Sequence, residues 1–165
     1  MTPVAQTQRR YSFDTSGLID GIERYYPLPN FPGLWAGIDE LIDQGRLLVS
    51  EEAWSEALAA DAPLREWCEE PGMGRDKCVY GTDAQVAAIA GSIGTDYPNW
   101  VKQGGKNAAD PFVIAVGELH DCLVVSGEKN GGPSNPKIPY VCQQRGVRHG
   151  RFVDVIRSEG WILGR

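Results

Sequence analysis

Short apolar segments alternate with helical patterns along this chain, and the alternation most strongly limits the folds that it can adopt. The strand-like runs are residues 11–13, 46–49 and 122–125, and the last is the most strongly β-forming of them. Parallel strands need helical crossovers and are covered by helices on both faces, so that the strands are apolar. The pattern therefore predicts an α/β sandwich built around a mainly parallel sheet.

Periodic apolar positions and capping residues predict the helices between and after these strands. The expected helices span residues 18–26, 32–44, 51–60, 63–70, 82–93, 110–120 and 152–159. The Gly/Pro/Asn-rich segment 127–136 reads as a loop, and residues 139–143 as a further strand. No internal repeat divides the chain, so we expect residues 1–10 to be a disordered lead-in and residues 11–165 to form one domain.

The length and composition favour an ordinary cytoplasmic protein. None of the apolar runs in the 165 residues approaches the roughly 20 needed to cross a bilayer, and the polar N-terminus lacks the apolar centre of a secretory signal. The four cysteines stand far apart without a C-x-x-C pair, which argues against structural zinc and against a disulfide framework. We expect reduced thiols and no association with membranes.

The charge is unevenly distributed. Residues 1–100 carry 7 Lys and Arg against 16 Asp and Glu, whereas residues 101–165 carry 9 against 6. An acidic first part and a basic last part would suit an acidic metal site beside a phosphate-binding flank. Chance variation in surface charge explains the same distribution equally well.

Four acidic residues fall near the expected ends of strands or the starts of helices: Asp14, Glu56, Asp110 and Glu128. In open α/β sheets, ligands bind beyond the carboxyl ends of the strands. Magnesium prefers oxygen ligands, and two such ions about 3.5–4 Å apart can promote hydrolysis of a phosphodiester. Taken singly, each acid is more often structural: Asp14 and Asp110 as helix starts, Glu56 on a solvated face and Glu128 in a loop. Their joint order favours a shared site.

Six short motifs occur in a fixed order along the chain. They are Phe13-Asp14-Thr15-Ser16, Tyr25-Tyr26-Pro27, Val49-Ser50 followed by Glu56, Ala109-Asp110-Pro111-Phe112-Val113-Ile114-Ala115, Val124-Val125-Ser126-Gly127-Glu128 and Lys137-Ile138-Pro139-Tyr140-Val141-Cys142. This series resembles the motifs of PIN-like domains, and of one bacterial PIN-like subfamily in particular. The likeness runs from about Tyr11 to Trp161.

The resemblance implies a PIN-like three-layer sandwich with a central, mainly parallel sheet of four or five strands. It also implies a Mg²⁺- or Mn²⁺-dependent endoribonuclease, often the toxin of a toxin–antitoxin pair, with an antitoxin partner and a possible homodimer. By motif, Asp14, Glu56, Asp110 and Glu128 would be catalytic acids that bind the metal, and Ser16 would orient a water molecule. Water would attack the phosphorus in line and leave a 5′-phosphate and a 3′-hydroxyl. The fourth acid is more often Asp in the family, so Glu128 would act directly or through water.

Basic residues in the last third of the chain are candidates for binding the RNA backbone. The three that we select are Lys106, Lys129 and Arg148. Neutralisation of phosphates supplies most of the sequence-independent affinity for nucleic acid. Each of these residues would more often be a solvated surface charge.

Other enzyme classes lack their signatures. An aspartyl-phosphate phosphatase would need an acid where Ser16 stands, and neither a P-loop nor a G-x-S-x-G elbow is present. Two alternatives stay open: a PIN-like scaffold that binds RNA or protein without cutting, and a structure-specific DNA nuclease. Activity on single-stranded RNA, structured RNA and flapped DNA would separate them.

Overall fold

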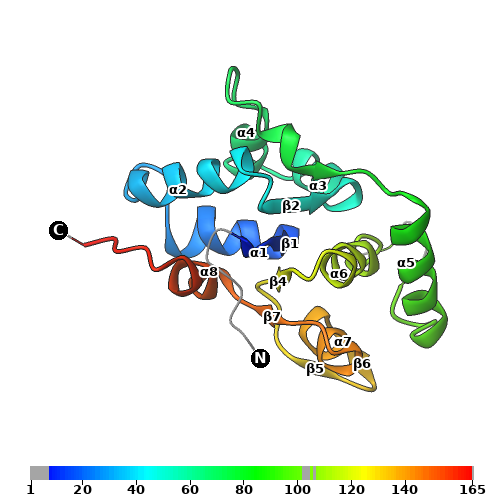
Figure 1. The fold of residues 1–165 in the computed structure, drawn as a ribbon. Helices are drawn as coiled ribbons and strands as arrows, with labels where there is room; N and C mark the ends of the chain where they lie inside the picture. The colour runs from blue at the N-terminus through cyan, green and yellow to red at the C-terminus, as the bar shows by residue number, and fades with distance from the viewer. Residues whose placement is uncertain (1–7, 102–104, 106, 165) are drawn as a thin grey trace.

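A five-stranded, all-parallel sheet forms the centre of the protein in a computed structural model, which describes residues 8–101, 105 and 107–164 (Figure 1). The strands lie in the order β3-β2-β1-β4-β7. Their bounds are Tyr11–Phe13 (β1), Leu47–Ser50 (β2), Val79–Tyr80 (β3), Leu123–Val125 (β4) and His149–Gly150 (β7). The expected parallel sheet of four or five strands is confirmed.

Helices cover both faces of the sheet, which confirms the three-layer sandwich. In Figure 1, α1, α2 and α8 lie on one side of the sheet. Helix α6 lies on the other side, and α5 packs on its outer face. The α-helices of the described part are Thr15–Ile19 (α1), Pro32–Asp43 (α2), Glu51–Leu58 (α3), Leu64–Glu69 (α4), Ala84–Asp96 (α5), Asp110–Leu119 (α6), Ile138–Arg145 (α7) and Phe152–Glu159 (α8). A π-helix, Asp20–Tyr25 (η2), continues α1, and a 3₁₀ turn, Arg75–Cys78 (η3), precedes β3.

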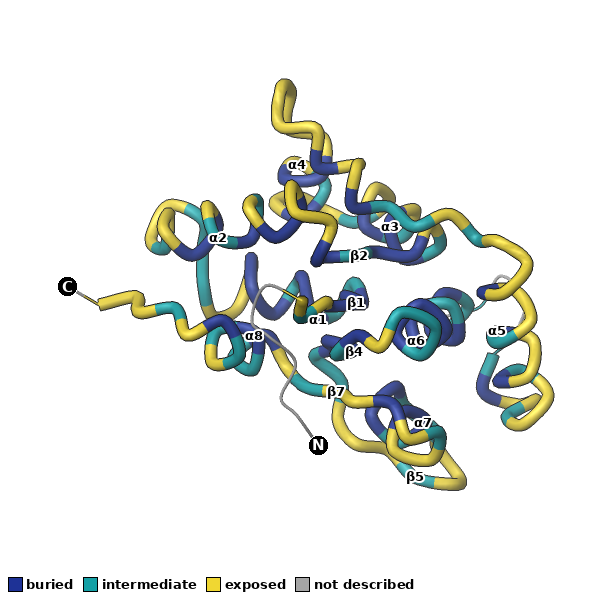
Figure 2. Tube along the Cα trace, viewed as in Figure 1, coloured by how far each residue is buried: buried dark blue, intermediate teal, exposed yellow. Residues whose placement is uncertain are grey.

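The core lies between these layers, where the strands and the inner faces of the helices are buried (Figure 2). Helix α6 approaches the sheet closely because Gly117 has no side chain: a Cβ there would lie 2.4 Å from Cγ2 of Val124. The hydroxyl of Ser12 in β1 donates to the carbonyl of Val113 in α6 at 2.8 Å. These contacts fix α6 against the middle of the sheet. None of the described helices is long and apolar enough to span a membrane.

Most helices begin close to the expected residues, and two starts show how capping side chains fix them. The Ser50 hydroxyl accepts from the N–H of Ala53 at 3.2 Å and starts α3. The first helix starts earlier than residue 18, at Thr15, because the side chain of Asp14 caps it. Residues 1–7 of the expected lead-in lie outside the described residues, whereas the Arg10 carbonyl accepts from the N–H of Leu123 at 2.9 Å.

The strand expected at residues 139–143 is wrong, because these residues belong to α7. Ile138, Val141 and Cys142 are buried and share one helical face through their i, i+3, i+4 spacing. Pro139 sits in the first turn, where its missing N–H removes no helical hydrogen bond, and Gly146 ends the helix with a φ of +69°. The expected loop 127–136 contains a small antiparallel hairpin, Gly131–Gly132 (β5) and Asn135–Pro136 (β6). The two-residue strands β3 and β7 were not predicted.

Candidate metal centre

The order of the strands creates one position where side chains from distant segments meet. The chain moves outward from β1 through β2 to β3, and then returns to the other side of β1 to form β4 and β7. Strands β1 and β4 are therefore neighbours whose following segments leave in opposite directions, which is the usual place for a ligand site in such sheets. Asp14 follows β1, and Glu128 lies three residues after β4.

Asp14 is fixed by the end of β1 and the start of α1. Its N–H donates to the carbonyl of Val125 at 2.8 Å, which ties it to the end of β4. One carboxylate oxygen, Oδ2, accepts from the backbone N–H and the hydroxyl of Ser16. Asp14 is only 4% exposed. Its other carboxylate oxygen, Oδ1, is buried and has no hydrogen-bond partner among the described residues.

Asp110 is the first residue of α6. This helix leads into the start of β4, so its first turn lies at the edge of the sheet where the parallel strands end. The N–H of Asp110 donates to the carbonyl of Asn107 at 3.2 Å, and Pro111 occupies the first turn. Asp110 is 5% exposed, and within the described ranges its Oδ2 also has no hydrogen-bond partner.

Glu128 reaches the same space from the segment after β4. Its Oε2 accepts from the N–H of Ile138, the first residue of α7, at 2.9 Å. The carbonyls of Gly127 and Glu128 accept from the guanidinium of Arg151 at 3.2 and 3.1 Å. One carboxylate oxygen is thus anchored at the α7 N-terminus, and the backbone on which the side chain stands is held in place.

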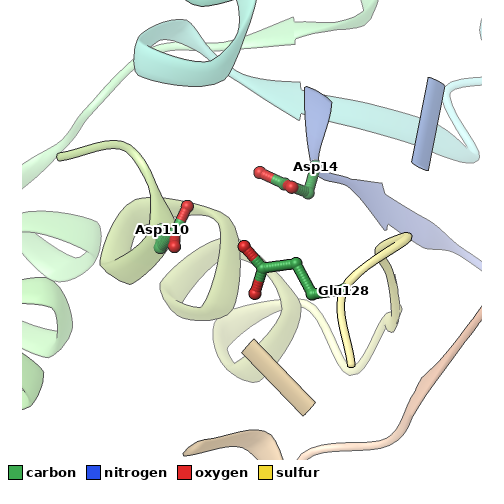
Figure 3. A group of neighbouring side chains, drawn as sticks. All are labelled: Asp14, Asp110 and Glu128. Atoms are coloured by element: carbon green, nitrogen blue, oxygen red, sulfur yellow. The ribbon is translucent and has the colours of Figure 1, made fainter. Parts of the chain in front are cut away.

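The three carboxylates meet. One oxygen from each of Asp14, Asp110 and Glu128 lies within 4.8 Å of the others, and Figure 3 shows the side chains pointing into a shared space from β1, α6 and the segment after β4. A buried carboxylate oxygen without a partner is costly, because its desolvation is not repaid by a hydrogen bond. Two such oxygens beside a third acid fit a hard divalent cation, which oxygen ligands of this type bind.

The electrostatics agree with this interpretation. Burial, followed by repulsion from Asp14, Glu128 and Glu56, raises the pKa of Asp110 to about 9. Burial also raises the pKa of Asp14 and of Glu128. Carboxylates this close cannot all be ionised without a compensating positive charge.

Glu56 lies beside the three acids without joining the tightest group. Its carboxylate accepts from the Thr15 hydroxyl at 3.2 Å, and its pKa is raised first by burial and then by the charge of Asp14. The structure therefore places all four predicted acids in one neighbourhood. Asp14, Asp110 and Glu128 are the nearest to one another, and Glu56 stands at their edge next to Asp14.

Ser16 connects two of the acid-bearing segments. Its hydroxyl group donates to Oδ2 of Asp14. The hydroxyl oxygen of Ser16 also accepts from the N–H of Gly127 at 2.9 Å. The single hydroxyl proton is therefore directed to Asp14. This geometry supports a positioning role for Ser16, since it joins the residue after β1 to the residue before Glu128.

Of the predicted basic residues, Arg148 lies away from the acids, whereas Lys129 directly follows Glu128 in the chain. Lys129 is exposed. Arg148 precedes β7 and donates to the carbonyl of Asp121 at 2.7 Å, at the edge of the sheet where the strands begin. Lys106 lies outside the described residues. The cation whose attraction lowers the pKa of both Asp110 and Glu128 is instead Lys137, which the sequence reading missed as a site residue.

Comparison with known protein families identifies one that matches the chain. A family model described as a domain of unknown function (DUF4411) matches residues 11–163, which is nearly the whole chain. No curated protein sequence matches it.

Proposed function

The chain belongs to the DUF4411 family, and we propose that its members with these acids are divalent-metal-dependent nucleases that hydrolyse RNA phosphodiester bonds. One observation carries the proposal: Asp14 and Asp110 each bury a carboxylate oxygen without a hydrogen-bond partner among the described residues, and both lie against Glu128. Nothing in the hydrophobic packing requires three acids there. A site for Mg²⁺ or Mn²⁺ accounts for them.

The residues divide into binding and positioning groups. Asp14 and Asp110 would bind the cation through their unpartnered oxygens, and Glu128 through the carboxylate oxygen that does not accept from Ile138. Glu56 would join through its edge position beside Asp14. When bound, a divalent ion supplies positive charge to phosphoryl oxygens and promotes ionisation of water. Ser16 and Arg151 hold the acid-bearing segments in register.

RNA is the proposed substrate because the order of the acids along the chain resembles that of PIN-like domains. The same resemblance underlies the proposal that the protein is the toxin of a toxin–antitoxin pair. A cognate antitoxin would then cover this edge of the sheet, and a homodimer is the assembly that we propose to test first.

The function is tested by incubating the protein with single-stranded RNA, structured RNA and flapped DNA in Mg²⁺, in Mn²⁺ and with a chelator. Cleavage of RNA that needs the metal and disappears in Asp14→Asn and Asp110→Asn supports the proposal. Asp61→Asn is the matched control, because Asp61 is an exposed acid outside the cluster. Cleavage of flapped DNA alone would indicate a DNA nuclease. RNA binding without cleavage would indicate a scaffold.

A further inference from the structure

Lys137 lies next to the acid cluster, although the function proposed above does not use it. It is the N-cap residue of α7, with an extended backbone (φ −134°, ψ 165°). The next residue, Ile138, donates its N–H to the Glu128 carboxylate at 2.9 Å. The lysine is therefore attached one residue away from the point where Glu128 is anchored.

The hairpin β5–β6 fixes the direction of the lysine side chain. Gly131 in β5 has a φ of +74°, and a Cβ at that position would lie 2.7 Å from Cγ and 2.8 Å from Cβ of Lys137. The aliphatic stem therefore packs directly on the backbone of the hairpin. Lys137 is half-buried, so its stem has fewer rotamers available than that of the exposed Lys129.

The ammonium group of Lys137 is near enough to the acids for its positive charge to lower the pKa of both Asp110 and Glu128. Lys137 is attached one residue from the Ile138 N–H that binds the Glu128 carboxylate. In the part of the chain that the structure describes, no ion pair or hydrogen bond occupies the ammonium. A protonated amine cannot coordinate a metal ion, because it has three donors and no lone pair. Its natural partner here is an anion that also contacts the metal.

The charges indicate which anion fits. The ammonium of Lys137 carries one positive charge that no ion pair with a described acid uses. A phosphodiester carries one negative charge and neutralises it, and the additional negative charge that develops during hydrolysis is attracted to the same group.

The surroundings provide space for a polymeric substrate. A groove of about 360 Å³ runs beside the hairpin and is lined by Tyr97, Asn99, Asn107 and Pro136 among others. Asn107 accepts from the N–H of Asp110, and Pro136 precedes Lys137. The groove is therefore lined by residues that connect directly to Asp110 and Lys137, and its asparagine and aromatic side chains suit a nucleotide chain.

On these observations, which rest on the function proposed above, we propose that Lys137 binds a non-bridging oxygen of the substrate phosphodiester beside Asp110 and Glu128. The amine donates to the phosphate while the carboxylates hold the cation. Lys137 thereby joins Lys106, Lys129 and Arg148, the residues that the sequence suggested for phosphate binding. It does not contribute to binding the metal itself.

The test uses Lys137→Met, which keeps an aliphatic stem on Gly131 and removes the charge. The control is Lys77→Met, because Lys77 pairs with Asp43, which is not one of the four acids. Binding of Mn²⁺ alone is followed by electron paramagnetic resonance. Binding of a short oligouridylate RNA in Ca²⁺ is followed by fluorescence anisotropy. We expect Lys137→Met to bind RNA about 10- to 100-fold more weakly, the loss typical of a charge-assisted hydrogen bond. Its Mn²⁺ affinity should change by much less, because the amine is not a ligand of the metal.

Equal RNA affinity in the two variants, or no metal-dependent RNA binding by the wild-type protein, overturns the proposal. If Lys137→Met is poorly folded by circular dichroism, Lys137→Gln takes its place with the same expectations. The proposed nuclease function is judged separately by cleavage in Mg²⁺. Wild-type cleavage with normal RNA binding by Lys137→Met rejects the lysine role alone. Absence of cleavage with weakened binding by the variant keeps the lysine role and rejects the nuclease.

Discussion

The hydroxyl oxygen of Ser16 accepts a hydrogen bond from the backbone N–H of Gly127 at 2.9 Å, across 111 positions of sequence. The same hydroxyl donates to the carboxylate of Asp14. One side chain thereby couples the acid after β1 to the segment that carries Glu128, and the spacing of the two acids depends on it.

Ser16→Ala should therefore weaken metal binding more than it weakens the fold. Loss of a group that orients metal ligands typically costs about 10- to 100-fold in affinity, whereas one hydrogen bond contributes only about 1 kcal/mol to stability. Mn²⁺ titration and urea unfolding measure the two effects. Ser92→Ala is the control, because Ser92 is exposed and its hydroxyl donates to the Ile89 carbonyl of its own helix. A Ser16→Ala protein with wild-type Mn²⁺ affinity would contradict the positioning role.

Asp110→Asn should stabilise the metal-free protein, and the gain should grow with pH. The folded state raises the pKa of Asp110 from 3.8 to about 9, so between these values the folded protein binds more protons than the unfolded chain. The free energy of unfolding therefore falls as pH rises through this window. Asparagine removes the effect, and we expect the melting temperature at pH 8 to rise by at least about 3 °C. Near pH 3.5 the two proteins should melt alike; a stabilisation that does not depend on pH would argue against this origin.

The same raised pKa predicts how metal affinity depends on pH. A cation that binds Asp110 must displace its proton when the pH is below about 9. If one proton is released, the apparent affinity for Mn²⁺ should increase about tenfold for each pH unit between pH 6 and pH 8. Calorimetric titrations in buffers of different ionisation enthalpy count the released protons directly. Affinity that is constant over this range would show that Asp110 is not a ligand.

Glu128 combines two roles that substitutions can separate. Its carboxylate caps the N-terminus of α7 through Ile138, and its other oxygen is directed to the acids. Glu128→Gln keeps an acceptor for the cap and removes a carboxyl group whose pKa the fold raises, so stability at pH 7 should not fall while Mn²⁺ affinity falls. Glu128→Ala should lose both the cap and the metal-binding charge, and loss of the cap should lower the free energy of unfolding by about 0.5–2 kcal/mol. Equal stability of the two variants in urea would show that the cap contributes nothing.

The turn before Glu128 leaves little room for a side chain. A Cβ on Gly127 would lie 2.4 Å from Oδ2 of Asp20, a buried acid that pairs with Arg24 at 3.3 Å. Gly127→Ala should therefore cost about 1–3 kcal/mol, as overpacking usually does. Gly33→Ala is the matched control, because nothing lies within 4 Å of its Cβ position and alanine favours the helix by up to about 1 kcal/mol. Urea unfolding of both variants checks the contrast, and a neutral Gly127→Ala would mean that Asp20 moves freely.

The parts of the site that depend on local sequence signals could be predicted from the sequence. Asp14 follows a short apolar strand and caps the next helix, and Asp110 opens a helix with proline in its first turn; both patterns are visible in the residues themselves. The meeting of these acids depends on β1 and β4 being neighbours in the sheet, and this strand order was not predicted from the sequence.

The missed features follow from one wrong assignment. If residues 139–143 formed a strand, the N–H of Ile138 would be engaged in a sheet, and Lys137 would have no defined direction. As the start of α7, Ile138 offers a free N–H to Glu128, and Lys137 becomes the residue beside the acids. Two buried β-branched residues in a short segment resemble a strand until the turn at Gly146 and the helical spacing are considered together.

Binding of Mn²⁺ to the wild-type protein and to Asp14→Asn, followed by electron paramagnetic resonance at pH 8, tests the metal centre most directly. The carboxylates of Asp14, Asp110 and Glu128 should bind Mn²⁺ saturably in the wild-type protein. Asp14→Asn, folded to the same degree by circular dichroism, should bind it more than about tenfold more weakly. Wild-type protein that leaves the Mn²⁺ signal of free solution unchanged, or a variant that binds equally well, would contradict the account.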